Sequence, residues 1–358
     1  MKFNWTGWDI GGAHVKAAEF DAEGRLVKVV QQPCPLWKGI DQLESAVSTI
    51  IKGLVTADTH HAITMTGELV DLFANRDDGV RRIIEVMQVL LSNRGILIYA
   101  GKSGFLQPEQ IETLHYQDIA SANWLASATL AANGVGSGLF VDIGSTTTDI
   151  LVLNNSHVMA EGYTDYQRLL SRELVYTGIV RTAVMAVAQT ANDEGRDIGL
   201  MAEYFATMAD VYRVTGELTE EHDQTETADG AEKSVMASAR RLSRLLGCDF
   251  CPDSLHRWLR FAKDIRAQQV RKIQRSCEQV LSRQGIDKAR PLVGAGIGRF
   301  LVQELAINLG RPYLDFAELL PGATFDTGMT SADCAPAVAV GILAKQRMDD
   351  TIDCLSVS

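Results

Sequence analysis

Apolar and polar residues alternate with the period of β-strands over the first 30 residues of the chain. The pattern predicts strands at residues 3–10, 14–20 and 25–30, joined by a glycine turn and by a turn at residues 21–24. Three such strands form a β-meander. Helical periodicity and short apolar runs then alternate to about residue 130, with strands expected at residues 63–66 and 96–99. This alternation is typical of a mixed or parallel sheet covered by helices.

A second meander is predicted at residues 138–162, and it repeats the first. Aligning DIGGAHVK (residues 9–16) with DIGSTTTD (residues 142–149) matches three of eight positions, in the same strand-turn-strand context. An internal duplication is the natural interpretation.

The pattern becomes helical between residues 166 and 285, interrupted by a polar, acidic stretch at 217–229 that we expect to be a loop. The basic stretch 260–275 has apolar residues at helical spacing, so its cations are expected on the wet face of an amphipathic helix. A strand returns at 291–293, a helix follows the glycine run 294–298, and a last helix is expected at 335–347. We therefore predict a first lobe at 1–130, a second lobe at 131–165 and 286–358, and a mainly helical insertion at 166–285.

Length, composition and charge narrow the classes of function. A chain of 358 residues with 46% hydrophobic and 22% charged residues is expected to fold throughout, into more than one packed unit. The net charge of −11 argues against nucleic acid as a partner. No apolar run approaches the roughly 20 residues of a membrane helix, and six scattered cysteines suit a reducing compartment. We expect a cytoplasmic protein with a small-molecule partner, and a homo-oligomer stays open.

The candidate chemistry lies in the two repeated turns. A strand that ends in an aspartate and runs into a glycine turn places a carboxylate and backbone N–H groups together, which can hold Mg²⁺ and phosphate oxygens. The alternative for one copy alone is a plain tight turn. Two copies favour a phosphate site with Mg²⁺ bound by Asp9 and Asp142, facing each other across a cleft. The expected phosphate-binding residues are Gly11, Gly12, Ala13, Gly144, Ser145, Thr146 and Thr147.

A third glycine run follows the returning strand and opens a helix. Gly294, Gly296 and Gly298 are candidates for a ligand-facing loop that also contacts the phosphorylated ligand. Close packing of the helix on the sheet is the alternative explanation of these glycines.

Two phosphate loops and a later glycine-rich loop, in this order, resemble the actin-like ATPase and sugar kinase superfamily. Within this superfamily, the chain resembles the hydantoinase/oxoprolinase-like branch more closely. In that branch it is most similar to the condensing enzymes of methanofuran biosynthesis. Bacterial members of that group are linked to tetrahydromethanopterin-dependent one-carbon transfer. The motifs that carry this resemblance are DIGGAHVK (9–16), MTGEL (65–69), VDIGSTTTD (141–149), ELVYTG (173–178), ADVYR (209–213), TADG (227–230) and RRL (240–242). The resemblance implies an α/β, two-lobed actin-like ATPase fold, related to ribonuclease H.

The resemblance also implies an activity. Members of this group join an aminomethyl-furanmethanol diphosphate to the phenol oxygen of a tyramine- or tyrosine-type glutamyl acceptor and release pyrophosphate. The expected enzyme is therefore a transferase that forms an aryl-alkyl ether. An ATP-dependent small-molecule kinase is the alternative, although Ala13 stands where many kinases of the superfamily have Thr or Ser. A non-catalytic member that binds a nucleotide as a switch is a third possibility.

Several side chains are candidates for the chemistry that the resemblance implies. A phenol with a pKa near ~10 loses its proton as the ether forms, so a general base is expected, and Asp149 and Glu68 are the candidates. Lys16 is expected to hold a diphosphate oxygen, or else to form a partly buried ion pair. Four cations of the insertion are candidate ligands of the diphosphate or of a glutamyl carboxylate: Arg213, Lys233, Arg240 and Arg241. The alternative is that they pair on the surface with Glu217, Asp223 or Asp229. Core packing is expected for Trp124 and Tyr176.

Overall fold

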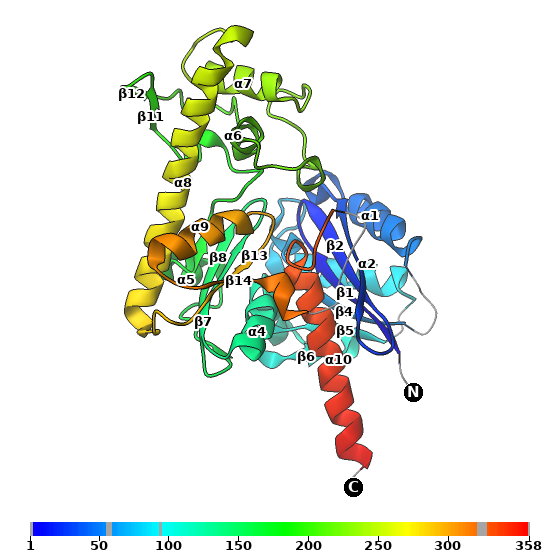
Figure 1. Ribbon diagram of the computed structural model, residues 1–358. Coiled ribbons are helices and arrows are strands. Elements are labelled where there is room, and N and C mark those ends of the chain that lie inside the picture. Colours follow the sequence, from blue (N-terminus) through cyan, green and yellow to red (C-terminus); the bar gives the residue numbers. More distant parts are fainter. Residues whose placement is uncertain (1–2, 55–58, 93–94, 321–327, 357–358) are drawn as a thin grey trace. The chain divides into compact units, whose positions relative to one another are not determined.

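The structure is a computed structural model that describes residues 3–54, 59–92, 95–320 and 328–356 (Figure 1). Contacts along the chain divide it into two compact units. Unit 1 comprises Met1–Gly138, Leu153–Arg168 and Leu314–Ser358, and unit 2 comprises Leu139–Val152 and Leu169–Tyr313. Among the helices of these described ranges, none has an apolar stretch long enough to cross a membrane.

The sheet of unit 1 begins with the predicted meander. β1 (Asn4–Ile10), β2 (His14–Phe20) and β3 (Leu26–Pro33) pair antiparallel in succession. β4 (Thr59–Met65) lies parallel to β1, β5 (Ile96–Tyr99) lies parallel to β4, and the short β6 (Phe105–Leu106) closes the edge. The strand order is β3-β2-β1-β4-β5-β6, so the expected mixed sheet is confirmed.

Helices cover this sheet because each has an apolar face to bury. α1 (Asp41–Ile51) and α2 (Arg76–Leu90) share one hydrophobic core with β1, β2, β4 and β5. α3 (Tyr116–Ile119) and α4 (Asn123–Val135) follow β6, and α10 (Ala335–Ser356) packs against α4, β1, β2 and β4.

The position of α10 differs from the predicted lobe boundary. The predicted second lobe includes residues 286–358, whereas residues 314–358 belong to unit 1 by their contacts. The reason is close packing on β1: a Cβ atom at Gly7 would lie 1.9 Å from the Ala337 carbonyl oxygen, and one at Gly341 would lie 2.4 Å from the Phe20 ring. Small residues therefore let this helix approach the first sheet.

The second sheet repeats the order of the first. β7 (Gly138–Ile143) lies between β8 (Thr148–Asn154) and β13 (Leu292–Ala295), and β13 is parallel to β7. β9 (His157–Val158) and β10 (Leu174–Val175) pair with β8, and β14 (Tyr313–Asp315) lies beyond β13. The order β2-β1-β4 of the first sheet thus corresponds to β8-β7-β13, which is what an internal duplication predicts.

The predicted insertion is mainly helical in the structure. It contains α5 (Asp165–Ser171), α6 (Met208–Thr215), α7 (Val235–Arg244) and α8 (Leu255–Gln284), and α9 (Arg299–Leu309) follows β13. A hairpin of β11 (Thr190–Asp193) and β12 (Arg196–Gly199), which the sequence pattern did not predict, packs on α8. Figure 1 shows α6 and α7 beside α8.

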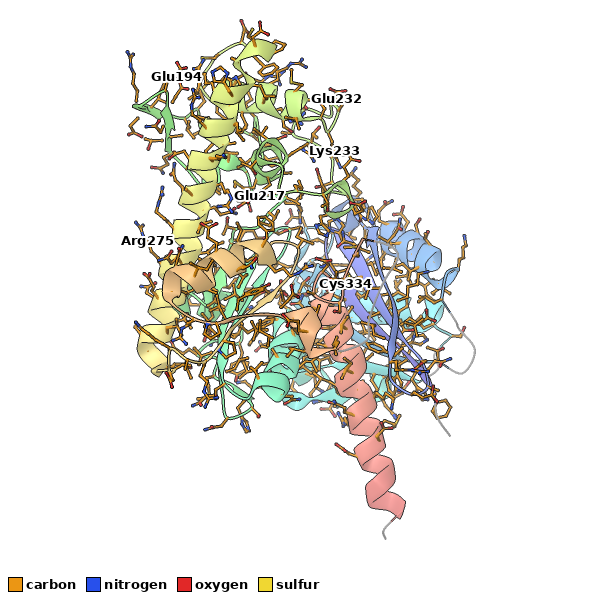
Figure 2. All side chains as sticks on the ribbon, in the orientation of Figure 1. Glu194, Glu217, Glu232, Lys233, Arg275 and Cys334 are labelled. Atoms are coloured by element: carbon orange, nitrogen blue, oxygen red, sulfur yellow. The ribbon has the colours of Figure 1, made fainter. Side chains whose placement is uncertain are left out.

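The amphipathic character predicted for the basic stretch is confirmed in α8. The apolar residues of its inner face are buried: Ile265, Val270, Ile273, Cys277 and Val280. Arg275 is exposed on the outer side of the helix (Figure 2). Most cations of the basic stretch are exposed, as expected, whereas Arg266 is partly buried and pairs with Glu217 and Glu304.

Candidate functional site: two strand-end loops

The loop between β1 and β2 is held by backbone hydrogen bonds that leave two of its N–H groups available. The Gly11 N–H donates to the His14 carbonyl at 2.9 Å and closes the hairpin. The carbonyls of Gly12 and Ala13 accept hydrogen bonds from Leu36 and Cys34, at 3.1 and 2.8 Å. The N–H groups of Gly12 and Ala13 have no hydrogen-bond acceptor among the residues that the structure describes. An uncompensated pair of amide donors suits an anion.

Asp9 lies at the end of β1, beside this loop. Its side chain is buried, and the Asn123 side-chain amide donates to its Oδ1 at 3.4 Å. Lys16 is the residue opposite Asp9 on β2, and its Nζ donates to the Asp333 carbonyl at 2.9 Å. The predicted metal ligand and the predicted diphosphate ligand are thus neighbours within unit 1.

Glu68 follows directly after β4, in the turn that packs against the same loop. The Thr66 N–H donates to the Ile10 carbonyl at 2.9 Å, which ties this turn to the end of β1. The Glu68 side chain is only 1% exposed, and burial raises the pKa of its carboxyl group. Ser121 donates to its Oε1 at 2.7 Å, while its Oε2 has no partner among the described residues. A perturbed buried carboxyl group beside a candidate anion site is a candidate for proton transfer.

The loop between β7 and β8 has the same construction. The Gly144 N–H donates to the Thr147 carbonyl at 2.9 Å, as Gly11 does to His14. The carbonyl of Gly144 accepts from Ile179, and that of Ser145 accepts from Val180 and Arg181. Within the described part of the chain, the N–H groups of Ser145 and Thr146 have no acceptor. The two loops therefore share their hydrogen-bond pattern as well as their sequence.

A buried segment behind the second loop holds it in place. A Cβ atom at Gly178 would lie 2.4 Å from the Thr146 backbone nitrogen, so only glycine fits there. The buried Gln269 of α8 donates to the Thr177 hydroxyl at 2.8 Å and to the Gly178 carbonyl at 2.9 Å. Thr148 donates to the Thr177 carbonyl at 2.8 Å. This packing explains why the ELVYTG motif accompanies the loop.

Arg181 is a candidate site residue that the sequence analysis missed. Its guanidinium group donates to the Thr146 hydroxyl at 3.3 Å, and its backbone N–H donates to the Ser145 carbonyl at 2.9 Å. The side chain is partly exposed. A cation at the tip of an amide-rich loop adds to the loop's attraction for an anion. The signal in the sequence was weak, because Arg181 lies more than 30 residues after the loop that it contacts.

Asp142 occupies the position in β7 that Asp9 occupies in β1. It is the residue opposite Ala295 on β13, and its side chain is partly exposed. Gly296 has a φ of 78°, and a Cβ atom there would lie 2.3 Å from Asp142 Oδ1. The backbone after β13 therefore passes directly against this carboxylate, which only glycine permits.

Packing accounts for the other two glycines of that run. A Cβ atom at Gly294 would lie 2.8 Å from the Tyr313 ring, and one at Gly298 would lie 2.5 Å from the Ile143 and Ile179 side chains. Both glycines are buried. The close-packing alternative therefore has structural support, and a diphosphate contact at Gly294, Gly296 and Gly298 stays a prediction.

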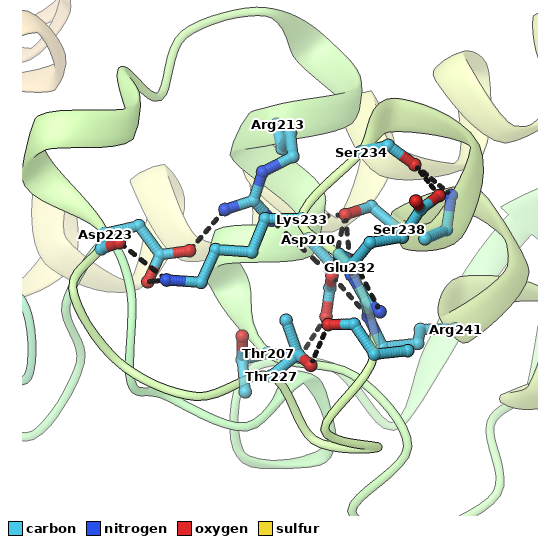
Figure 3. Close-up of polar contacts among 12 residues, drawn as sticks. Thr207, Asp210, Arg213, Asp223, Thr227, Glu232, Lys233, Ser234, Ser238 and Arg241 are labelled. Carbon is cyan, nitrogen blue, oxygen red and sulfur yellow. Dashed lines mark hydrogen bonds and ion pairs between the residues drawn. The ribbon is translucent and has the colours of Figure 1, made fainter.

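Arg213, Lys233 and Arg241 of the insertion pair with aspartates in a partly buried network (Figure 3). Arg213 donates to Asp223 and to Ser238, and Lys233 donates to the Asp223 carbonyl at 2.7 Å. Arg241 is fully buried and donates to Asp210 at 2.7 Å and to Asp229 at 3.0 Å. This pairing corresponds to the alternative expected from the sequence, except that Arg213, Arg241 and Asp223 are buried, whereas Lys233 and Asp229 keep contact with solvent. It fastens the acidic stretch to α6 and α7.

The remaining candidates lie in different surroundings. Asp149 is partly exposed on β8, opposite Leu174 of β10. Arg240 is exposed on α7, next to the buried Arg241. Trp124 is buried as expected, whereas Tyr176 is 61% exposed, so its predicted place in the core is wrong. It follows the edge strand β10, where alternate side chains point away from the core.

The chemistry of the second loop fits Mg²⁺. A carboxylate, the hydroxyls of Ser145, Thr146 and Thr147, and backbone amides suit a phosphate-bound Mg²⁺, which takes few protein ligands. Among the described residues, no group of three or more His, Cys, Asp or Glu side chains forms a ready-made metal cage.

Comparisons with known proteins agree with this geometry. Residues 59–338 match the model of the hydantoinase/oxoprolinase family. The (4-{4-[2-(gamma-L-glutamylamino)ethyl]phenoxymethyl}furan-2-yl)methanamine synthase of Methanocaldococcus jannaschii is 35% identical over 250 residues, which cover 70% of this chain and 73% of that protein. The synthase of the same name from Methanococcus vannielii is 32% identical over 111 residues, covering 31% of this chain and 50% of that one.

Among solved structures, the nucleotide-free structure of an acetone carboxylase resembles this chain with a TM-score of 0.56 and a sequence identity of 11%. The superposition covers 87% of this chain and 68% of the acetone carboxylase chain. Such a likeness concerns the fold alone. The two related sheets, each with a strand-end aspartate and an amide loop, define a protein of the actin-like ATPase and sugar kinase fold. Within that class, the chain belongs to the hydantoinase/oxoprolinase family.

Proposed function

We propose that this protein is a transferase of methanofuran biosynthesis. It condenses an aminomethyl-furanmethanol diphosphate with the phenol oxygen of a tyramine- or tyrosine-type glutamyl acceptor and releases pyrophosphate. The family membership and the two related synthases support this proposal. The single observation that carries it is the second loop, where a strand-end carboxylate, a guanidinium group and two amide donors without an acceptor among the described residues gather within one unit.

The main task of such an enzyme is to stabilise negative charge on the departing diphosphate, because the furan ring itself stabilises the positive carbon. The N–H groups of Ser145 and Thr146 and the Arg181 guanidinium group would bind the diphosphate oxygens. Asp142 would bind Mg²⁺, which when bound neutralises charge on the leaving group. We assign the corresponding roles in unit 1 to Asp9, Lys16 and the N–H groups of Gly12 and Ala13.

The phenol must lose its proton as the new ether bond forms. Asp149 and Glu68 are the candidate acceptors of that proton. Asp149 is partly exposed and can meet a substrate directly, whereas the Glu68 carboxyl group is buried. Arg240 is exposed and suits the glutamyl carboxylate of the acceptor.

Thermal unfolding with Mg²⁺-pyrophosphate and with Mg²⁺-ATP tests which anion the loops bind. A ligand at 100 times its Kd stabilises a protein by roughly 2.7 kcal/mol, a readily measured shift. We expect Mg²⁺-pyrophosphate to stabilise the wild type, and Asp142→Asn to abolish the shift while the exposed Asp197→Asn leaves it unchanged. Stabilisation by ATP alone would favour the kinase alternative instead.

A further inference from the structure

Ser121 and Glu68 form a buried hydrogen-bonded pair in unit 1. The Ser121 hydroxyl donates to Glu68 Oε1 at 2.7 Å, and the two side chains are 8% and 1% exposed. Glu68 Oε2 has no partner within the described ranges. A buried carboxyl oxygen without a partner is costly, so its presence beside a candidate site calls for an explanation.

The backbone at Ser121 is strained. Its φ of 51° lies in the left-handed region, which a residue other than glycine seldom adopts. Ser121 lies between α3 and α4, and two residues later Asn123 donates to Asp9. Strain of this kind persists where the surrounding structure holds a residue for function. One short segment thus contacts both Glu68 and the carboxylate of the first loop.

Charged groups from two helices act on Glu68. Burial raises the pKa of its carboxyl group most, the Ser121 hydrogen bond and Arg76 of α2 lower it, and Asp165 of α5 raises it again. Arg76 and Asp165 form an ion pair with each other, so their effects on Glu68 oppose one another. Burial therefore raises the pKa of this carboxyl group above that of an ordinary glutamate, which makes it a stronger base once it is ionised.

We propose that Ser121 and Glu68 form a proton relay for the acceptor phenol, an inference that rests on the proposed function. The phenol O–H bond breaks and its proton passes to Ser121 Oγ, while the Ser121 proton passes to Glu68 Oε1. The phenol oxygen forms a bond to the furfuryl carbon, and the bond from that carbon to the diphosphate breaks with its electron pair on the pyrophosphate. Ser121 is the group that touches the substrate, and Glu68 acts through it. This arrangement explains how a carboxyl group that is almost fully buried can still receive the proton.

Two variants remove either half of the pair. Ser121→Gly deletes the hydroxyl and suits the positive φ, so it adds no backbone strain. Glu68→Gln deletes the titrating group. We expect each to lower kcat for pyrophosphate release by roughly 10²–10⁴-fold, and the double variant to be no slower than either single one, because both act in one relay. The acid limb of the wild-type pH profile should disappear in both.

Ser127→Ala is the matched control. Ser127 is a fully buried serine of α4 whose hydroxyl has no hydrogen-bond partner among the described residues, so its loss should leave kcat and the pH profile unchanged. A Ser121→Gly enzyme that keeps the wild-type rate and acid limb would overturn the relay. So would rate losses that multiply in the double variant.

A titration without turnover separates this inference from the proposed function. In ¹³C-glutamate-labelled protein, the carboxyl signal that Glu68→Gln removes should titrate about one pH unit higher in Ser121→Gly than in the wild type, because the hydroxyl stabilises the carboxylate. An unshifted titration contradicts the relay whatever the enzyme's activity. If the titration shift is present but the wild type releases no pyrophosphate, the proposed function is contradicted. Ser121 and Glu68 would then act on a different substrate.

Discussion

At the scale of single residues, two adjacent arginines of α7 are expected to differ in how much they contribute to the free energy of unfolding. Arg241 is 0% exposed and binds Asp210 and Asp229, whereas Arg240 is exposed to solvent. A buried ion pair is expensive to break from one side, because the partner's charge is then left buried without compensation. An exposed cation contributes little to the free energy of unfolding, because solvent screens its charge.

Arg241→Ala should therefore lower the free energy of unfolding by about 3–5 kcal/mol. Arg240→Ala should change it by no more than about 0.5 kcal/mol. Urea-induced unfolding of both variants, followed by circular dichroism, measures the difference. Equal losses in the two variants would mean that the network in Figure 3 does not hold the insertion together.

The sequence predicts the positions of candidate residues where these depend on local order along the chain, while their binding roles stay predictions. The aspartates and turns of the two loops were found because each loop is a continuous run of residues. Arg181, Ser121 and Asn123 were not found, because each reaches its loop or carboxylate only through tertiary contacts. Arg213 and Lys233 were identified as cations near an acidic stretch, but only the structure shows that Asp223 binds both.

At the scale of elements, the pairing of β1 with β4 buries His61. Trp8 of β1 donates through its Nε1–H to Nδ1 of His61 on β4 at 3.3 Å, and burial, together with neighbouring His60, lowers the pKa of His61 to about 4. An unfolded histidine titrates near 6.5. Because the unfolded chain binds the proton more readily, this strand pair should lose stability as the pH falls from 6.5 to 4.

The loss from His61 should reach about 3 kcal/mol at the acid end of that window, and His61 contributes no pH dependence above it. His61→Gln should flatten the dependence of the unfolding free energy on pH between 6.5 and 4. The exposed His157→Gln serves as the control and should keep the wild-type slope. A His61→Gln variant whose slope equals that of the wild type would show that His61 does not stay neutral in the folded protein.

Elements were predictable where the hydrophobic period was clear. Both meanders, the short parallel strands and the amphipathic face of α8 follow directly from it. The β11–β12 hairpin was not predicted, because its strands carry few apolar residues and β12 is exposed throughout. The place of α10 was also missed, since small residues such as Gly341 indicate close packing without indicating the partner.

At the scale of the whole molecule, each unit has its own hydrophobic core and its own amide loop. The core of unit 1 is built around β1, β2, β4 and β5, and that of unit 2 around β7, β8 and the helices α6 to α9. The duplicated fold class could be predicted because the repeat covers both the strands and the turn between them. The boundaries of the units could not, because they depend on which sheet the C-terminal helix covers.

The most direct test of the proposed transferase supplies purified protein and Mg²⁺ with an aminomethyl-furanmethanol diphosphate and a glutamyl-tyramine acceptor. Mass spectrometry of the products and an enzymatic pyrophosphate assay are run on the same samples, without ATP. We predict one equivalent of pyrophosphate for each ether formed, and none when Asp142 is replaced by Asn. An ether that forms only when ATP is present, or no ether at all with both substrates bound, would contradict the account.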